Sequence, residues 1–108
     1  MIEKPLTLER MVAAINWRAE CDDQYAELKG DVLRCEILCK RVRARVFVGE
    51  EGSVDLRKAK AEIHPDTMAA DDELISAIIA FEKLRASRES ADSVVEGTRT
   101  AEASRRKT

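Results

Sequence analysis

Two cysteines and the single histidine are the side chains whose chemistry could bind a metal ion. Cys35 and Cys39 are four residues apart, so on a helix both thiols would face the same side and could bind zinc. A zinc site needs about four ligands, and His64 is the one histidine that could add a third. Both cysteines also belong to an apolar series in which a free cysteine acts as a small hydrophobic side chain. We therefore interpret them as packing residues and expect no metal ion and no cofactor.

The histidine and a group of carboxylates could also serve an enzyme. His64 could act as a general base, but no motif places a serine or cysteine nucleophile near it, and Pro65 follows it at a predicted helix break. Shortly after come four carboxylates, Asp66, Asp71, Asp72 and Glu73. They lack the spacing of an EF-hand loop, and negative charge near a helix N-terminus stabilises the helix. These patterns indicate a helix end, and we predict no catalytic residue.

A run of basic residues is harder to explain by packing or capping. Between positions 40 and 60 the chain has seven basic residues and three acidic ones. Arg41 and Arg45 share one helix flank by their spacing, and Phe47 lies close in sequence. Cations that bind phosphates, next to a ring on which bases stack, are typical of proteins that hold single-stranded nucleic acid. The predicted nucleic-acid-binding residues are Lys40, Arg41, Arg43, Arg45, Phe47, Arg57, Lys58 and Lys60.

The same basic run has a second interpretation, which the sequence leaves open. Between positions 61 and 82 there are six acidic residues and no lysine or arginine, so adjacent stretches carry opposite charge. The basic side chains could be solvated and paired with Glu36, Glu50 and Glu51. Alternatively, they could dock on the acidic stretch of a neighbouring subunit.

Capping residues and periodicity predict the helix that carries the basic run. Thr7 can cap a helix that begins at Leu8. A heptad seam of apolar residues then continues for three repeats, through Tyr25, Leu28, Val32, Cys35, Cys39, Val42 and Val46. The same register would place Arg18 in the seam, so we expect the seam to shift within residues 17–21.

The second half of the chain predicts a return to the first helix. Gly49–Gly52 predicts a tight reversal, Ser53 caps a short helix, and Pro65 predicts a kink. A second long helix should begin at about Asp66 or Thr67. It carries a matching strip made of Ala70, Leu74, Ala77, Phe81, Leu84, Arg88, Ala91 and Val95.

The predicted fold class is all-α, a long antiparallel helical hairpin with coiled-coil-like packing. Charged residues make up 37% of the chain and aromatic residues only 4%, a composition typical of long helices. Ile75, Ile78 and Ile79 widen the apolar face of the second long helix, so we expect a homo-oligomer. The hairpin domain should cover residues 1–97. The polar, basic segment 98–108 should be frayed or disordered.

The sequence also favours a cytoplasmic location. The chain begins with Met-Ile-Glu-Lys, which does not resemble a secretory signal. The longest apolar run is far below the roughly 18 residues of a membrane span, so no membrane partner is expected. An odd number of cysteines, three, is typical of free thiols in a reducing compartment.

A resemblance to one family rests on the end of the first long helix. Its elements are the basic-Ala-basic sequence Arg43-Ala44-Arg45, the tip sequence Phe47-Val48-Gly49, and an Ala- and acid-rich stretch at 61–73. Over roughly residues 25–105 the chain resembles the phage T4-type recombination mediators of the UvsY family. The resemblance implies a ring-like homo-oligomer in the host cytoplasm whose basic residues bind single-stranded DNA. It also implies that the protein helps to displace a single-strand-binding protein and loads a RecA-like recombinase.

Two functions from different classes are compatible with the sequence. One is a single-stranded DNA-binding recombination mediator, in which oligomerisation multiplies weak phosphate sites along one strand. The other is a non-enzymatic coiled-coil adaptor, or a structural or regulatory protein, that binds a protein partner. Salt-sensitive binding to a single-stranded oligonucleotide distinguishes them.

Overall fold

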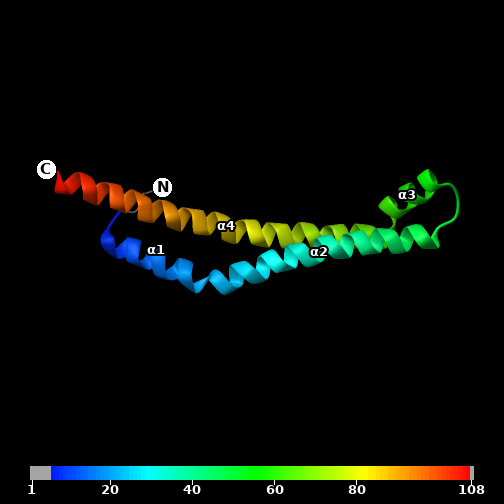
Figure 1. Cartoon of the computed structure of the whole chain (residues 1–108), viewed down its shortest axis with the longest axis horizontal. Coiled ribbons are helices and arrows are strands. Elements are labelled where there is room, and N and C mark those ends of the chain that lie inside the picture. The colour runs from blue at the N-terminus through cyan, green and yellow to red at the C-terminus, as the bar shows by residue number, and fades with distance from the viewer. Residues whose placement is uncertain (1–5, 108) are drawn as a thin grey trace. The chain divides into compact units, whose positions relative to one another are not determined.

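The computed structural model describes residues 6–107, which form four α-helices (Figure 1). In chain order they are α1 (Leu8–Glu20), α2 (Asp22–Gly49), α3 (Val54–Ile63) and α4 (Pro65–Arg106). The predicted all-α class is therefore confirmed. Within the described residues, no helix combines the length and the apolar character that crossing a bilayer requires.

The chain divides into two compact units. The terminal unit comprises the residues up to Tyr25 and those from Lys83 onward, and the tip unit comprises Ala26–Glu82. In the tip unit α2 and α4 run antiparallel, as Figure 1 shows, and the Cys39 thiol donates a hydrogen bond to the Ala70 carbonyl at 3.3 Å. The predicted antiparallel pairing is confirmed. Side chains in a helical pair contact only neighbours across the seam, so contacts gather locally. The single hairpin domain over residues 1–97 stays a prediction.

Side-chain caps begin two of the helices at the predicted residues. The Thr7 hydroxyl accepts a hydrogen bond from the Arg10 N–H at 3.1 Å at the start of α1. The Ser53 hydroxyl accepts one from the Leu56 N–H at 3.2 Å at the start of α3. Each cap satisfies a backbone donor that the first turn of a helix leaves without a partner.

The reversal and the kink also lie where the sequence predicts them. Gly52 has φ +116°, a left-handed conformation that favours glycine, and a Cβ there would lie 2.8 Å from the Leu56 side chain. His64 is extended, and its Nδ1 accepts a hydrogen bond from the Asp66 N–H at 3.0 Å. Helix α4 begins directly after it at Pro65, which has no N–H to satisfy.

The expected shift of the seam in residues 17–21 is wrong. Met11, Ala14 and Arg18 are half-buried, whereas Ile15 is 44% exposed, so the heptad register continues upstream with Arg18 inside it. The helix, not the register, is interrupted here. Cys21 separates α1 from α2 and bonds back through its N–H to carbonyls of the preceding turn. A charged residue stays in the seam because a carboxylate from α4 lies next to it.

The predicted seam on α4 is longer than we expected. Thr67 and Thr98 are fully buried and continue the three-and-four spacing at both ends of the strip. The Thr98 hydroxyl donates to the Val94 carbonyl at 2.7 Å, which satisfies a buried polar group within its own helix. Thr98 with its internal hydrogen bond therefore substitutes for an aliphatic residue at a seam position, whereas the buried Thr67 hydroxyl has no hydrogen-bond partner among residues 6–107.

The segment from Thr98 onward differs from the expectation of a frayed tail. Helix α4 continues through it to Arg106, while Thr108 lies outside the described residues. Gly97 does not end the helix. A Cβ at position 97 would lie 3.0 Å from the Leu6 side chain, so the glycine leaves room for the chain that precedes α1. The polar composition of this segment predicted no packing, whereas the structure places Gly97 against Leu6 and continues the helix.

Candidate functional site

The centre of the basic run is an arginine that joins three helices of the tip unit. Arg43 on α2 donates to both carboxylate oxygens of Glu62 on α3, from Nε at 2.9 Å and from NH2 at 3.3 Å. It also donates to both oxygens of Asp71 on α4, at 2.9 and 2.8 Å. Two paired sets of hydrogen bonds on one guanidinium form the geometry in which arginine binds carboxylates most strongly. Arg43 therefore connects α2, α3 and α4.

The charge states around Arg43 follow from these contacts. Hydrogen bonds to Glu62 and then to Asp71 raise the pKa of Arg43 well above its usual range. Hydrogen bonds from Arg43 hold the pKa of Asp71 below its usual value, although burial opposes this. Burial raises the pKa of the Cys39 thiol, and a hydrogen bond with Asp71 adds to the effect. These shifts favour the charged form of Arg43, the carboxylate form of Asp71 and the neutral form of the Cys39 thiol.

Three further residues of the basic run also have partners within the tip unit. Arg45 pairs with Asp66 at 3.1 Å. The Arg57 guanidinium lies 4.2 Å from the centre of the Phe47 ring and donates to the Phe47 carbonyl at 3.0 and 3.1 Å. Lys60 donates to a backbone carbonyl of the reversal at 3.1 Å. One face of Phe47 is therefore covered by a cation, which leaves that face closed to a stacking base.

The remaining members of the predicted nucleic-acid surface are differently placed. Lys40, Arg41 and Lys58 are exposed, and none of them is paired with a carboxylate among residues 6–107. One alternative for the basic run was docking on the acidic stretch of a neighbouring subunit, but that stretch supplies Glu62, Asp66 and Asp71 to arginines of the same chain. The structure thus divides the predicted set into four internally bonded cations and three unpaired ones.

A groove lies beside one of the unpaired cations, Lys58. It occupies about 610 Å³ between the end of α2 and α3. The residues that line it are Ala44, Phe47, Val48, Ala61, Arg43, Lys58 and Glu62. The apolar members suit an aliphatic side chain, and the charged ones border it with both signs.

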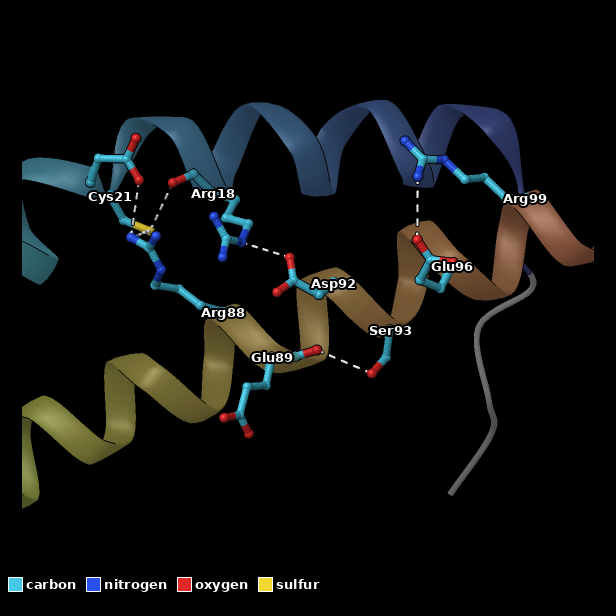
Figure 2. Close-up of polar contacts among 9 residues, drawn as sticks. Arg18, Cys21, Arg88, Glu89, Asp92, Ser93, Glu96 and Arg99 are labelled. Carbon is cyan, nitrogen blue, oxygen red and sulfur yellow. Dashed lines mark hydrogen bonds and ion pairs between the residues drawn. The ribbon is translucent and has the colours of Figure 1, made fainter.

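The terminal unit contains a second set of charged residues, which the sequence reasoning missed. Arg18 on α1 and Asp92 on α4 point toward each other, with Nε 2.6 Å from Oδ1 (Figure 2). The Arg18 N–H is not aligned on that oxygen, so the contact is a charge pair without a directed hydrogen bond. Arg88 on α4 lies 3.1 Å from Asp22 on α2. Helix α4 therefore supplies Arg88 and Asp92 to a reciprocal layer, while α1 supplies Arg18 and α2 supplies Asp22.

Arg88 is the most enclosed member of this reciprocal layer. Its side chain is 12% exposed, and its guanidinium lies 4.2 Å from the centre of the Tyr25 ring. It also donates to the Cys21 sulfur at 3.8 Å, and Cys21 in turn donates to the Arg18 carbonyl at 3.3 Å. The sequence signal for this layer was the repeated spacing Arg-x-x-x-Asp at 18–22 and again at 88–92. In an antiparallel helical pair that spacing brings each arginine to the other helix's aspartate.

The cysteines lie on the packed side of their helices. Cys21 and Cys39 are buried and Cys35 is half-buried, and all three are free thiols. Cys39 bonds to a backbone carbonyl, and His64 caps α4. Among residues 6–107 no group of three or more histidine, cysteine, aspartate or glutamate side chains is arranged to hold a metal ion.

Comparison with known proteins assigns no family to this chain. No family model, curated protein or solved structure matches it. The resemblance to the UvsY-type mediators therefore stays a prediction.

Proposed function

We propose that this protein is a non-enzymatic helical assembly protein, a scaffold or adaptor that works by associating with itself through exposed aliphatic faces. The observation that carries the proposal is the size of the buried and the exposed apolar side chains. Among the described residues, the buried apolar ones are Cys21, Cys39, Val46, Ala61, Ala70 and Ala91. None is larger than valine. Larger aliphatic residues with exposed side chains include Leu8 and Ile15 on α1, Leu33 and Ile37 on α2, and Ile75 and Ile79 on α4, whereas Leu28, Leu74 and Leu84 in the seam are half-buried.

This distribution supports association because burying the exposed aliphatic side chains would lower the free energy of the assembled state. Burying a leucine or isoleucine side chain stabilises by about 1.5–3 kcal/mol, whereas alanine contributes far less. The exposed leucines and isoleucines add their share of hydrophobic stabilisation only when a second surface covers those faces. The internally bonded arginines also support an interior structural role for part of the basic run.

The test is the concentration dependence of mass and of thermal unfolding. We expect a mass greater than one chain at micromolar concentration, and an unfolding temperature that rises with protein concentration because association stabilises the folded state. Mass photometry and calorimetry measure both. A single-chain mass with an unfolding temperature that does not change across a hundredfold range of concentration would contradict the proposal.

A second candidate function is the single-stranded DNA-binding mediator, which would load a RecA-like recombinase. The observation that favours it is that Lys40, Arg41 and Lys58 are exposed and lack carboxylate partners among residues 6–107. Three cations per chain, multiplied by an oligomer, are enough for salt-sensitive binding of a strand.

Fluorescence anisotropy with a labelled oligonucleotide tests this second function. Log affinity should fall with log salt at about −0.7 per phosphate neutralised. Changing Lys40, Arg41 and Lys58 to alanine together should remove binding, whereas Arg45→Ala should change it less because Arg45 already pairs with Asp66. Affinity that is insensitive to the triple change would reject the DNA-binding function.

A further inference from the structure

The outer faces of α2 and α4 in the tip unit, on the sides opposite their seams, have aliphatic residues where a solvated helix carries polar ones. On α2 the outer face consists of Leu33, Ile37, Lys40 and Ala44, and on α4 it consists of Met68, Asp72, Ile75 and Ile79. Leu33, Ile37, Met68, Ile75 and Ile79 are each between 49% and 56% exposed. In a helical pair the positions opposite the seam face water, so aliphatic residues there indicate a further interface.

The two outer faces are complementary in charge. The α2 face contains one cation, Lys40, and the α4 face contains one carboxylate, Asp72. Both are exposed, and neither has an ion-pair partner among residues 6–107. Each face is therefore an aliphatic stripe with a single unpaired charge, and the two charges are opposite.

The two outer faces also match in register. Along α2 the four positions are spaced by four, three and four residues, and along α4 the spacing is again four, three and four. In an antiparallel arrangement Leu33 would face Ile79, and Ile37 would face Ile75. The same alignment brings Lys40 to Asp72. A parallel arrangement would place each charge opposite an isoleucine, which is unfavourable because an unpaired charge would be desolvated.

The fourth pair of this alignment, Ala44 and Met68, would lie at the groove. Ala44 would face Met68, and Ala44 is one of the residues that line the space of about 610 Å³ between α2 and α3. Met68 is 56% exposed on its own helix. Methionine is flexible and fills irregular apolar spaces well. The small residue on one face and the large one on the other are thus compatible with close approach.

From these observations we propose that the outer face of α4 in one copy docks antiparallel onto the outer face of α2 in a second copy, with Met68 entering the groove. This inference rests on the proposed self-association and names the surfaces that perform it. The contact joins two different surfaces, so each copy can use its α4 face to bind one neighbour and its α2 face to bind another. Such contacts propagate into rings or open chains unless one face is blocked.

Complementation between two blocked variants tests the inference. Ile37→Lys blocks the α2 face and Ile75→Lys blocks the α4 face, and both positions are exposed, so circular dichroism should show parental helix content. Each variant alone should self-associate about tenfold or more weakly than the parent, a change of 1.4 kcal/mol per factor of ten. An equimolar mixture should form dimers that do not grow, because one intact pair of faces remains. Ser90→Lys, an exposed change elsewhere on α4, should assemble like the parent.

A charge exchange provides an independent readout. Asp72→Lys should weaken assembly by placing two lysines together, and the double variant Lys40→Asp with Asp72→Lys should restore it.

The outcomes separate this inference from the proposed function. Variants that assemble like the parent, or a mixture that remains monomeric, would overturn the assigned faces and leave the proposed function standing. A parent chain that is itself monomeric would overturn both. Capture of a different protein by these faces, with no self-association, would reject a second copy as the occupant.

Discussion

The terminal unit and the tip unit each place arginines between helices, but they do so in opposite ways. In the terminal unit Arg88 is nearly enclosed, at 12% side-chain exposure, and has one carboxylate, one aromatic ring and one sulfur around it. In the tip unit Arg43 is 32% exposed and has two carboxylates, each bound through both oxygens. One arginine is held mainly by packing, and the other mainly by hydrogen bonds.

The comparison shows that an arginine in a helical seam has two separable contributions. Its methylene stem and planar head fill volume, and its charge binds carboxylates. Burial increases the first contribution, whereas water at a partly exposed site weakens the second. We therefore expect the two arginines to respond differently to the same substitutions.

Truncation of Arg88 should have the largest effect. Arg88→Ala removes a packed side chain from beside Tyr25 and leaves Asp22 without its partner, so the free energy of unfolding should fall by about 2 kcal/mol. Arg88→Met, which keeps most of the volume and removes the charge, should lie within about 1 kcal/mol of the parent. Urea unfolding followed by circular dichroism measures both.

A matched control for this change lies in the same unit. Among residues 6–107 Arg99 pairs only with Glu96, one turn away on α4 (Figure 2). Both side chains are more than half exposed. Arg99→Ala should cost no more than about 0.5 kcal/mol. Equal losses for Arg88→Ala and Arg88→Met would show that charge, not packing, dominates in the terminal unit.

Truncation of Arg43 should have an intermediate effect with a different pattern. Arg43→Ala should lower the free energy of unfolding by about 1 kcal/mol, and Arg43→Met should lower it by as much, because only the guanidinium reaches both carboxylates. Amide hydrogen exchange in α3 should accelerate, since Arg43 connects that short helix to α2 and α4. Arg45→Ala is the control, and recovery of stability in Arg43→Met would contradict this assignment.

The smallest expected effect is on the acid dependence of stability, and it should be specific to the Arg43–Asp71 pair. The folded-state pKa of Asp71 lies below its ordinary value of 3.8, since Arg43 hydrogen-bonds to the charged form. Stability from this carboxylate is therefore fully present above pH 3.8 and is lost as pH falls through the lowered pKa. Asp71→Asn and Arg43→Ala should both reduce the acid sensitivity of the urea midpoint. An unchanged acid slope in both variants would show that Asp71 is not the responsible group.

Much of the fold was predictable because it depends on local rules. Caps at Thr7 and Ser53, the break before Pro65 and the seam that contains Cys39 all follow from backbone donors and side-chain periodicity. The candidate site was predictable only in part. The sequence identified the basic run but could not show that Arg43 and Arg45 are neutralised within the chain, because their partners are about twenty to thirty residues away.

The sequence by itself thus determined where α1 and α3 begin, where α2 ends, and which stripe α2 and α4 bury. Those properties depend on residues within a few turns of one another. Only the tertiary structure decided that Arg18 stays in the seam, that α4 continues past Gly97, and which cations remain unpaired. These outcomes depend on what the opposite helix places at each position, since a charge is tolerated in a seam when a counter-charge faces it.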